Sequence, residues 1–215
     1  MDHYLARQPI VDSQGNVIAY ELLYRNSEEN VYSAQDPHEA TRQVLHTAFH
    51  VMGLDFVSNG LPVFVNFTRD LIVNYRQLAV PPGLLIIEVL ESIEFDDELV
   101  RALHHLKKAG YQLALDDFNC NESIHGIPEI VRTTDFIKID FQAPFNRQQC
   151  TENLARRSQK KLIAEKVETL EDYQRALNSG YMYFQGYFFG KPEVLCKRST
   201  SLRIDDQIAG HLPGH

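Results

Sequence analysis

Six short apolar runs in this chain lead into side chains that can bind a metal ion or carry charge. They are VIAYE ending at Glu21, VFVN at Asn66, LLIIE at Glu88, LALDD at Asp116 and Asp117, FIKID with Lys138 and Asp140, and KLIAE at Glu165. A buried carboxylate is costly unless it is paired with a cation. Carboxylate and amide oxygens without His or Cys favour hard cations, so the set predicts a Mg²⁺ or Mn²⁺ site.

Such a site suits phosphoester hydrolysis. Two divalent ions bridged by an aspartate can hold a hydroxide and polarise a phosphoryl oxygen. A lysine such as Lys138 would orient the attacking water and stabilise charge in the transition state. Arg25, four residues after Glu21, is a candidate for a phosphate contact. The pattern therefore indicates an enzyme, or a descendant of one.

A purely structural explanation stays open beside this one. An acid at the end of a strand is often only the partner of a salt bridge, and that holds for any single member of the set. His46 and His50 have i,i+4 spacing, but they lack the Glu of H-E-x-x-H. We therefore expect them to form a helix face and not a metal site.

The elements that must position these residues alternate along the chain. YLARQPIVD and VIAYELLYR flank the turn SQGN and predict an N-terminal hairpin. Strand and helix patterns then alternate with short links, which indicates a mostly parallel sheet with helices outside. The hairpin strand and seven further runs are enough to close a barrel. We expect an α/β fold: a modified (β/α)8 TIM barrel with an antiparallel N-terminal strand.

Side-chain parity predicts which residues face the barrel interior. Within LLIIE, Ile86 and Glu88 share a face, as Lys138 and Asp140 do on their strand. Asp116 and Asp117 cannot both point inward on a regular strand, so one must lie where the strand turns into its loop. The aromatic run YMYFQGYFFG is expected in the barrel core.

The composition fits one large domain: 215 residues, 44% hydrophobic and 23% charged. We expect a barrel domain over residues 1–192 and a truncated or loosely attached tail over 193–215. The net charge of −8 gives no help with polymeric nucleic acid, so polymeric nucleic acid is not an expected partner. A phosphate-bearing substrate would need metal ions and a few aimed cations.

The cysteines and the hydropathy pattern indicate a cytoplasmic protein. Cys120, Cys150 and Cys196 are odd in number and far apart, which argues against a disulfide framework or a zinc knuckle. No apolar run reaches about 18 residues, so no membrane span is expected. The start, MDHYLARQPIVD, is too charged for a signal peptide.

The motifs, taken in order, resemble those of EAL domains, the bacterial cyclic di-GMP phosphodiesterases and their non-catalytic relatives. The resemblance runs over residues 4–192, and Glu21-Leu22-Leu23-Tyr24-Arg25 sits at the family signature with Leu22 in place of alanine. The other matching motifs are VNFT, IEVLE, DDF, FIKID, AEKVE and FQGYFFGKP. The resemblance implies a modified barrel that cleaves one phosphodiester of cyclic di-GMP to give linear pGpG, using two Mg²⁺ or Mn²⁺ ions, in bacterial signalling.

The resemblance also implies a role for each matching residue. The metal ligands would be Glu21, Asn66, Glu88, Asp116, Asp117 and Glu165, and the catalytic residues Glu21, Lys138 and Glu165. Lys138 would position the attacking water. Gln8, Leu23, Arg25, Gln185 and Pro192 would contact substrate, with Glu91, Asp140 and Glu168 in support.

Three departures from the family pattern bear on activity. The loop after DDF reads Asn119-Cys120-Asn121-Glu122 where the family is glycine-rich, Leu90 replaces a threonine, and Lys166 replaces the glycine of A-E-G-V-E. The family loop helps to set the second metal and couples to dimerisation. Loss of such support commonly costs about 10–100-fold in activity or metal affinity.

The wording of ARQPI, AYELLYR and AEKVET looks most like the branch in which an EAL domain precedes an HDOD domain. The chain would then be an excised module or a stand-alone form. A homodimer, an HDOD domain and another signalling domain or protein are the implied partners, beside cyclic di-GMP.

Competing hypotheses remain beside catalysis. A degenerate EAL domain could act as a cyclic di-GMP sensor, or as an adaptor that binds only protein. An enolase-type barrel fits the acids loosely, but it leaves QGYFFGKP and the spacing of Glu21 and Arg25 unexplained. We favour catalysis because damage to supporting residues usually slows an enzyme before it silences it.

Overall fold

The computed structural model describes residues 2–32, 34, 36–74, 80–90, 92–117 and 127–198. Glu91, the atypical loop from Asn119 to Glu122 and residues 199–215 of the predicted tail lie outside the described residues.

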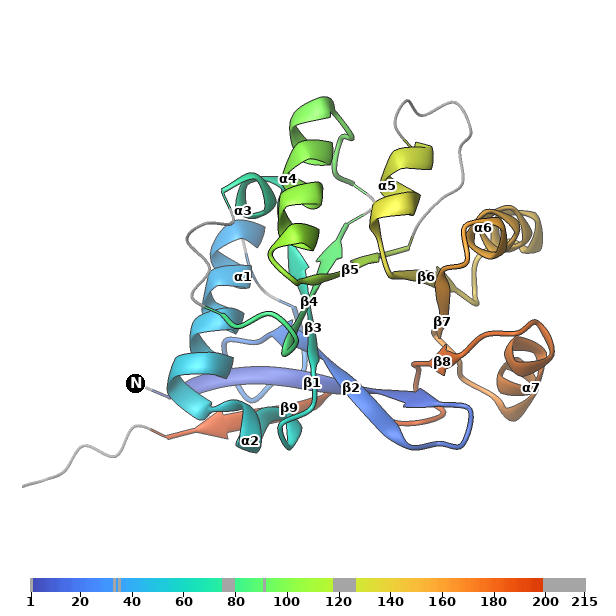
Figure 1. Cartoon of the computed structure of the whole chain (residues 1–215). Helices are drawn as coiled ribbons and strands as arrows, with labels where there is room; N and C mark the ends of the chain where they lie inside the picture. Colours follow the sequence, from blue (N-terminus) through green and yellow to red (C-terminus); the bar gives the residue numbers. More distant parts are fainter. Residues whose placement is uncertain are drawn as a thin grey trace, which may run out of the picture.

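Strands and helices alternate as the sequence predicts. The strands are β1 His3–Asp12, β2 Val17–Tyr24, β3 Val63–Phe67, β4 Leu85–Val89, β5 Gln112–Leu115, β6 Phe136–Asp140, β7 Lys161–Glu165, β8 Tyr183–Phe184 and β9 Glu193–Lys197. The helices are α1 Pro37–His46, its π-helical continuation η1 Thr47–Met52, α2 Leu54–Ser58, α3 Arg69–Val73, α4 Asp97–Lys108, α5 Ile127–Thr133, α6 Phe145–Arg157 and α7 Leu170–Asn178. In Figure 1 the helices surround the strands on the outside.

The sheet closes into a barrel. Its hydrogen-bonded order is β2-β3-β4-β5-β6-β7-β8-β1, and β1 also pairs with β2. Neighbouring strands from β2 to β8 run parallel, whereas β1 is antiparallel to both β2 and β8. The predicted modified TIM barrel with an antiparallel N-terminal strand is therefore confirmed.

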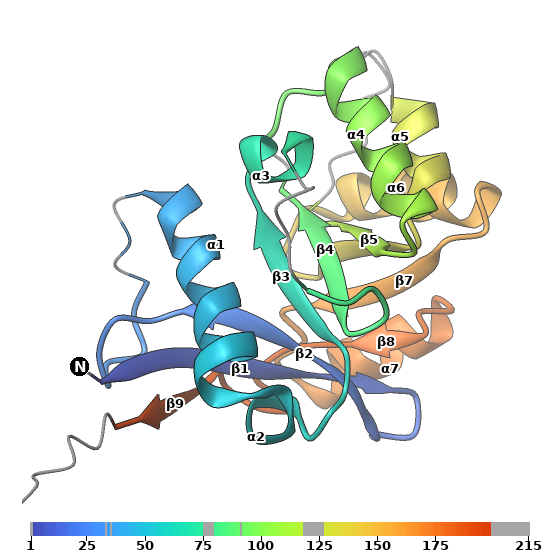
Figure 2. The same ribbon diagram turned by 60° about the vertical axis from the view of Figure 1, so that its left-hand side comes forward.

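The strand β9 extends the sheet beyond the barrel. It pairs antiparallel with the first half of β1, from His3↔Lys197 to Arg7↔Glu193, while β8 pairs with the end of β1 at Val11 and Asp12. Figure 2 shows β9 beside β1 near the N-terminus. The first five residues of the predicted tail thus belong to the sheet, and the domain boundary at residue 192 stays a prediction.

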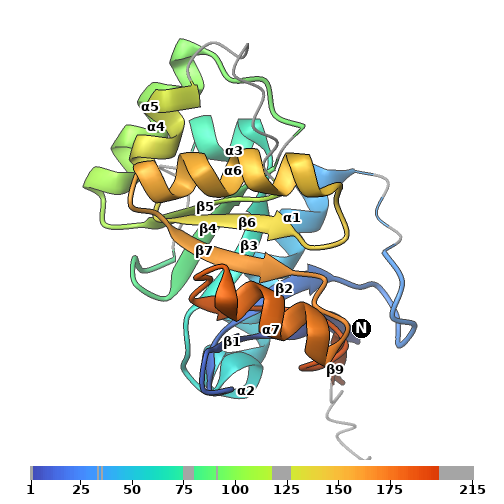
Figure 3. The ribbon, with the colours of Figure 1, turned by 90° about the vertical axis from the view of Figure 1, so that its right-hand side faces the viewer.

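Local capping fixes the loop that follows β7. Thr169 and Asp172 form a reciprocal capping box at the start of α7, in which the Thr169 hydroxyl accepts from the Asp172 backbone. Because α7 begins only a few residues after Glu165, this cap also holds the rim of the barrel. Figure 3 shows α6 and α7 lying over the β6 and β7 side of the barrel.

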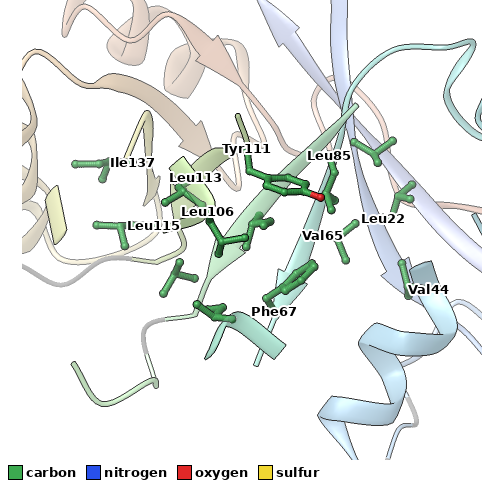
Figure 4. Close-up of a cluster of buried hydrophobic side chains, with 14 of the residues drawn as sticks. Leu22, Val44, Val65, Phe67, Leu85, Leu106, Tyr111, Leu113, Leu115 and Ile137 are labelled. Carbon is green, nitrogen blue, oxygen red and sulfur yellow. The ribbon is translucent and has the colours of Figure 1, made fainter. Parts of the chain in front are cut away.

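Two apolar clusters stabilise the barrel from inside and outside. The outer one fills the space between strands and helices, with Leu22, Val65 and Leu113 from the sheet packed towards Val44 of α1 and Leu106 of α4 (Figure 4). The inner one is a single layer inside the barrel, made of Ile10, Ala19, Phe64, Ile86, Ala114, Phe136 and Ile163, with Ile18 and Tyr183 packed against it. Alternation along each strand separates the two clusters.

Candidate active site

A polar layer lies directly above the inner apolar layer. Each of its members follows an inner-layer residue by two positions, which places both on the same face of the strand. These pairs are Ala19 and Glu21, Phe64 and Asn66, Ile86 and Glu88, Ala114 and Asp116, Phe136 and Lys138, Ile163 and Glu165, and Tyr183 and Gln185. On the antiparallel β1, Gln8 precedes Ile10 by the same spacing. The layer therefore sits at the C-terminal ends of the parallel strands, where barrel enzymes hold their active sites.

Lys138 occupies the centre of this layer. Its Nζ lies 2.6 Å from Glu88 Oε1, 2.7 Å from Glu165 Oε1, 3.0 Å from Asp116 Oδ1 and 3.6 Å from Glu21 Oε2. The lysine side chain is 1% exposed. Four carboxylates, three from β2, β4 and β7 and one from the residue directly after β5, thus converge on one buried ammonium group.

Burial and charge shift the pKa values of this cluster in opposing ways. Burial lowers the pKa of the Lys138 ammonium, but the charges of Asp116, Glu165, Glu21 and Glu88 outweigh it and hold that pKa well above its usual range. Burial raises the pKa of Glu88 well above its usual value, despite Lys138. Burial likewise raises the pKa of Glu165 to about 8. The cluster therefore holds more carboxylate charge than one ammonium group can compensate.

Amide side chains fix the orientation of Glu21. Gln185 Nε2 donates to Glu21 Oε2 at 2.5 Å, and Asn66 Nδ2 donates to Glu21 Oε1 at 3.3 Å. Gln185 Nε2 also lies 3.1 Å from Gln8 Oε1, and Gln8 donates to the Gly190 carbonyl at 3.0 Å. Glu21 lies within β2, which continues to Tyr24, so the strand does not end at this acid.

Several buried oxygen atoms in the layer have no hydrogen-bond donor among the described residues. They are Asn66 Oδ1, both carboxylate oxygens of Glu88, Asp117 Oδ1 and Gln185 Oε1. The charge of Glu88 is nevertheless compensated, since its Oε1 lies 2.6 Å from the Lys138 ammonium group in an ion pair. Buried acceptors normally find a partner.

The donor set fits a hard divalent cation, since it consists of carboxylate and amide oxygens. Within the described part of the chain, no three Asp, Glu, His or Cys side chains already lie in an arrangement that could hold a metal ion. The ammonium group of Lys138 lies among these carboxylates instead.

A cavity of about 360 Å³ opens above the polar layer. Nine predicted site residues line it: Gln8, Glu21, Leu23, Asp116, Asp117, Glu165, Glu168, Gln185 and Pro192. Lys166, Gly186 and Tyr187 complete the lining. Glu88 and Lys138 are fully buried and are absent from this lining, while Asn66 lines a neighbouring cavity of about 280 Å³. The volume is within the range of small-molecule sites.

The two consecutive aspartates after β5 serve different parts of the site. The strand ends at Leu115, so both lie beyond it, in keeping with the expected turn into a loop. Asp116 faces Lys138, whereas Asp117 has a φ of 43° and pairs at 3.5 Å with Lys166. Lys166 Nζ also lies 2.6 Å from Asp140 Oδ2.

Arg25 lies away from the described lining of the cavity. Its side chain is buried, with Nε donating to Asn30 Oδ1 at 2.9 Å and Nη1 donating to the Tyr24 carbonyl at 2.6 Å. Asn30 in turn donates to the Pro192 carbonyl at 2.8 Å. The arginine thus reaches the cavity indirectly, through the segment that carries Pro192.

Sequence reasoning missed three residues that line the cavity. Lys166 stands out in the sequence as a replaced glycine, and its place in the cavity lining does not follow from that pattern. Gly186 packs against the backbone of Val167, where an added Cβ would lie 2.2 Å from the Val167 carbonyl oxygen, so only glycine fits. Tyr187 was expected in the core, but it is 58% exposed at the cavity, and Phe188 is exposed as well. The core assignment of the aromatic run is thus wrong for these two residues, while Tyr181 and Phe184 are buried.

His46 and His50 are exposed on α1 and η1 with ring centroids 5.7 Å apart, which fits a helix face. Among the helices of the described residues, none has the length and apolarity needed to cross a membrane.

The chain is similar in sequence to curated bacterial proteins about twice its length. YuxH of Bacillus subtilis (strain 168), named an uncharacterized protein, is 39% identical over 204 residues, covering 92% of this chain and 49% of YuxH. The cyclic di-GMP phosphodiesterase CdgJ of Vibrio cholerae is 32% identical over 202 residues, covering 92% of this chain and 46% of CdgJ. The chain therefore spans about half the length of these curated relatives.

Solved structures share the fold. The PaMucR phosphodiesterase in complex with c-di-GMP matches with a TM-score of 0.70 and 23% identity, covering 89% of this chain and 96% of that one. The Bacillus subtilis YkuI protein, with an EAL domain and in complex with substrate c-di-GMP and calcium, matches with a TM-score of 0.65 and 21% identity, covering 88% of this chain and 54% of that one. Residues 3–192 match the EAL domain family itself. The match covers most of the chain, and it agrees with the modified barrel and with the carboxylate layer at its C-terminal rim. The chain is therefore a member of the EAL domain family.

Proposed function

We propose that this chain hydrolyses cyclic di-GMP to linear pGpG with the help of Mg²⁺ or Mn²⁺. The observation that carries the proposal is the polar layer below a cavity of suitable size. In this layer Asn66 Oδ1 and Glu88 Oε2 accept no hydrogen bond from the described residues and lie among the carboxylates that surround Lys138. Membership of the EAL domain family supports the same reaction. The name of the relative CdgJ is that of a cyclic di-GMP phosphodiesterase.

The carboxylates and Asn66 would hold the metal. Glu21, Asp116 and Glu165 line the cavity and, with the buried Glu88, surround Lys138 Nζ, and Asn66 contacts Glu21. Asp117 lines the same cavity. A bound divalent ion would supply an activated water and polarise a phosphoryl oxygen. The resemblance implies two such ions.

Lys138 would position the attacking water as a hydrogen-bond donor. The charges of Asp116, Glu165, Glu21 and Glu88 hold its pKa well above the usual range, which favours the charged ammonium group. A fixed cation that needs no reorganisation stabilises negative charge as it develops on the phosphoryl group. Glu21 and Glu165, at 3.6 Å and 2.7 Å from Lys138 Nζ, would complete the catalytic set.

The substrate would bind against the cavity walls. Gln8 and Gln185 present amides at one side, and Leu23 and Pro192 present apolar surface at another. We assign Arg25 to positioning of the Pro192 wall, because its hydrogen bond to Asn30 leads to the Pro192 carbonyl. Asp140 and Glu168 would support the outer rim, and we keep the supporting role of Glu91 as a proposal from sequence.

The charge balance makes a metal cofactor necessary for this substrate. A phosphodiester approaching Glu21, Asp116 and Glu165 meets negative charge, and the chain as a whole carries −8. Divalent cations reverse that local repulsion. The widely spaced cysteines support the cytoplasm as the compartment of the reaction, with the barrel of residues 1–192 as the reacting domain and a homodimer or HDOD-type domain as partner.

A binding module without turnover is the second candidate. The observation that favours it is Lys166, whose ammonium group lies between Asp117 and Asp140 where the family has glycine in the sequence. Such a protein would bind cyclic di-GMP in the same cavity and return it unchanged.

The deciding experiment incubates the purified chain with cyclic di-GMP and Mg²⁺ or Mn²⁺ and follows pGpG by chromatography. We expect product that requires metal and disappears in Glu21→Gln. The matched control is Glu171→Gln, the same change on the exposed face of α7. If the wild-type chain forms no product with either metal, hydrolysis is excluded, and calorimetric titration with cyclic di-GMP then tests the binding module.

A further inference from the structure

The outer edge of the cavity contains a second lysine whose position is unusual. Lys166 Nζ lies 2.6 Å from Asp140 Oδ2 and 3.5 Å from Asp117 Oδ2, and the side chain lines the same cavity as Glu21 and Glu165. Asp117 Oδ1 is buried and has no hydrogen-bond donor among the described residues. A cation therefore already sits between the two aspartates of this edge.

The backbone shows that this lysine is held in place at a cost. Lys166 has a φ of 53°, in the left-handed region that glycine adopts without strain and that side chains with a Cβ disfavour. Asp117, its partner, has a φ of 43°. Backbone strain of this kind is concentrated at functional sites, and here it brings two opposite charges together at the edge of the cavity.

Two carboxylates flank this ammonium group. Lys166 Nζ donates a hydrogen bond to Asp140 Oδ2 at 2.6 Å, and Asp117 Oδ2 lies 3.5 Å away. Arg147 adds a further positive group, with Nη2 at 3.5 Å from the Asp117 carbonyl.

The two halves of the site differ in the charge that remains to be compensated. Around Lys138, four carboxylates face one ammonium group. Around Lys166, two carboxylates face one ammonium group. A divalent cation is therefore strongly attracted to the inner half and only weakly to the outer half, where it would also have to displace the ammonium group.

We propose that the Lys166 ammonium group takes the place of a second cation between Asp117 and Asp140, so that this chain binds one divalent ion where the family resemblance implies two. The proposal rests on the proposed function, since it concerns the same metal site. The ammonium group supplies a fixed positive charge at the edge of the cavity, towards which a phosphate oxygen of the substrate can turn. The positive charge that a second metal ion would supply is thus supplied by the side chain of Lys166.

The test counts metal ions and needs no turnover. The full chain is freed of metal with chelator, equilibrated with Mn²⁺ by dialysis, and its bound Mn²⁺ measured by elemental analysis and by electron paramagnetic resonance. We expect one isolated ion in the wild-type chain and two in Lys166→Gly. Two ions about 3.5–4 Å apart would show exchange coupling in the spectrum. The affinity for the second ion should rise about tenfold or more when Lys166 is removed.

Two control variants separate position from charge. Lys166→Arg keeps the cation and should bind one ion. Lys161→Ala removes the same charge at the other end of β7, on the opposite rim, and should also bind one ion. Two ions bound equally well by the wild-type chain and Lys166→Gly would overturn the proposal, and so would a single ion in both.

The outcome is independent of the hydrolysis assay. A chain that binds one Mn²⁺, gains a second in Lys166→Gly and yet releases no pGpG would retain this inference and lose the proposed reaction. A chain that hydrolyses cyclic di-GMP with two bound ions would retain the reaction and lose this inference.

Discussion

Lys138 and Lys166 both pair with carboxylates at the C-terminal rim of the barrel, but the first is 1% exposed and the second 51% exposed. Lys138 projects from the interior of β6, two residues above Phe136 of the apolar layer. Lys166 lies just after β7, in a backbone conformation unfavourable for lysine. Lys138 thus lies within a regular strand, whereas Lys166 is the first residue after one.

The difference indicates how each half of the site responds to change. The inner half is held by strand register and by the packed layer below it, so its carboxylates cannot move apart when their cation is removed. In the outer half, the Lys166 side chain can turn its ammonium group from the aspartates into solvent, because half of that side chain is already in contact with water. We therefore expect substitutions in the inner half to change stability and metal binding strongly, and substitutions in the outer half to change them little.

The largest effect should follow from Lys138→Met in metal-free buffer. Removing one partner of a buried ion pair costs about 3–5 kcal/mol, since the remaining charges stay buried. Lys166→Met, the matched change in the outer half, should cost no more than about 1 kcal/mol, as exposed pairs do. Urea denaturation of both variants at pH 8 would measure the difference, and equal losses would show that burial does not separate the two lysines.

The loss in Lys138→Met should depend on pH. The folded-state pKa values of Glu88 and Glu165 are raised, that of Glu165 to about 8, above the unfolded value of about 4.3. Stability from such groups is fully present below the unfolded pKa and is lost as pH rises through the folded pKa. The variant should therefore be closer to wild type at pH 5 than at pH 8.

The next effect should be stabilisation by metal. An ion that binds only the folded chain adds about 2.7 kcal/mol at a concentration of 100 times its Kd. Because a proton must leave Glu165 to free its oxygens, the gain should be larger at pH 8.5 than at pH 6.5. Thermal unfolding with and without Mn²⁺ at the two pH values measures it, and a gain that shrinks as pH rises would contradict the placement of Glu165 at the metal.

A smaller effect should follow from Glu88→Gln. Burial raises the pKa of Glu88 well above its usual value, so its charged form is disfavoured there. Glutamine keeps the shape of the side chain without a charge, and the fold should therefore be retained. Metal affinity should fall by about 10–100-fold, because a charged ligand is lost. Asp140→Asn makes the same kind of change in the outer half, and calorimetry should find its effect on the first ion much weaker. If the two variants weaken Mn²⁺ binding alike, the inner half is not the metal site.

The smallest effect should come from Lys166→Gly. Its folding free energy should lie within about 1 kcal/mol of wild type, because relief of the left-handed backbone offsets the lost exposed pairs. Lys166→Ala should be less stable than Lys166→Gly by about 1 kcal/mol, since alanine retains the Cβ. Denaturation of the two variants side by side compares them directly, and equal stability would show that the positive φ carries no cost.

Much of this architecture follows from the sequence. Alternation of strand and helix patterns predicts the barrel, and parity predicts that Ile86 and Glu88 share a face. The distances do not follow, because the stagger of neighbouring strands decides which side chains meet. That four carboxylates meet at Lys138, and that Asn66 and Gln185 hold Glu21, depends on that stagger.

Other features depend on contacts that no local pattern encodes. Arg25 follows the signature motif at the expected place, yet its side chain turns to Asn30. Tyr187 and Phe188 have the composition of a buried strand, but β8 ends at Phe184, so both lie beyond the barrel wall. Lys166 stands out in sequence only as a replaced glycine, and its partners Asp117 and Asp140 are visible only in the fold.

The place of β1 in the sheet has a consequence for synthesis of the chain. This strand is synthesised well before its partners β8 and β9, which comprise residues 183–184 and 193–197. Until then one edge of the β1–β2 hairpin is open, and open strand edges recruit other strands. Contacts so distant in sequence also form slowly. We therefore expect nascent chains to stay incomplete until translation has passed β9, so chaperones that shield strand edges would act on them throughout elongation.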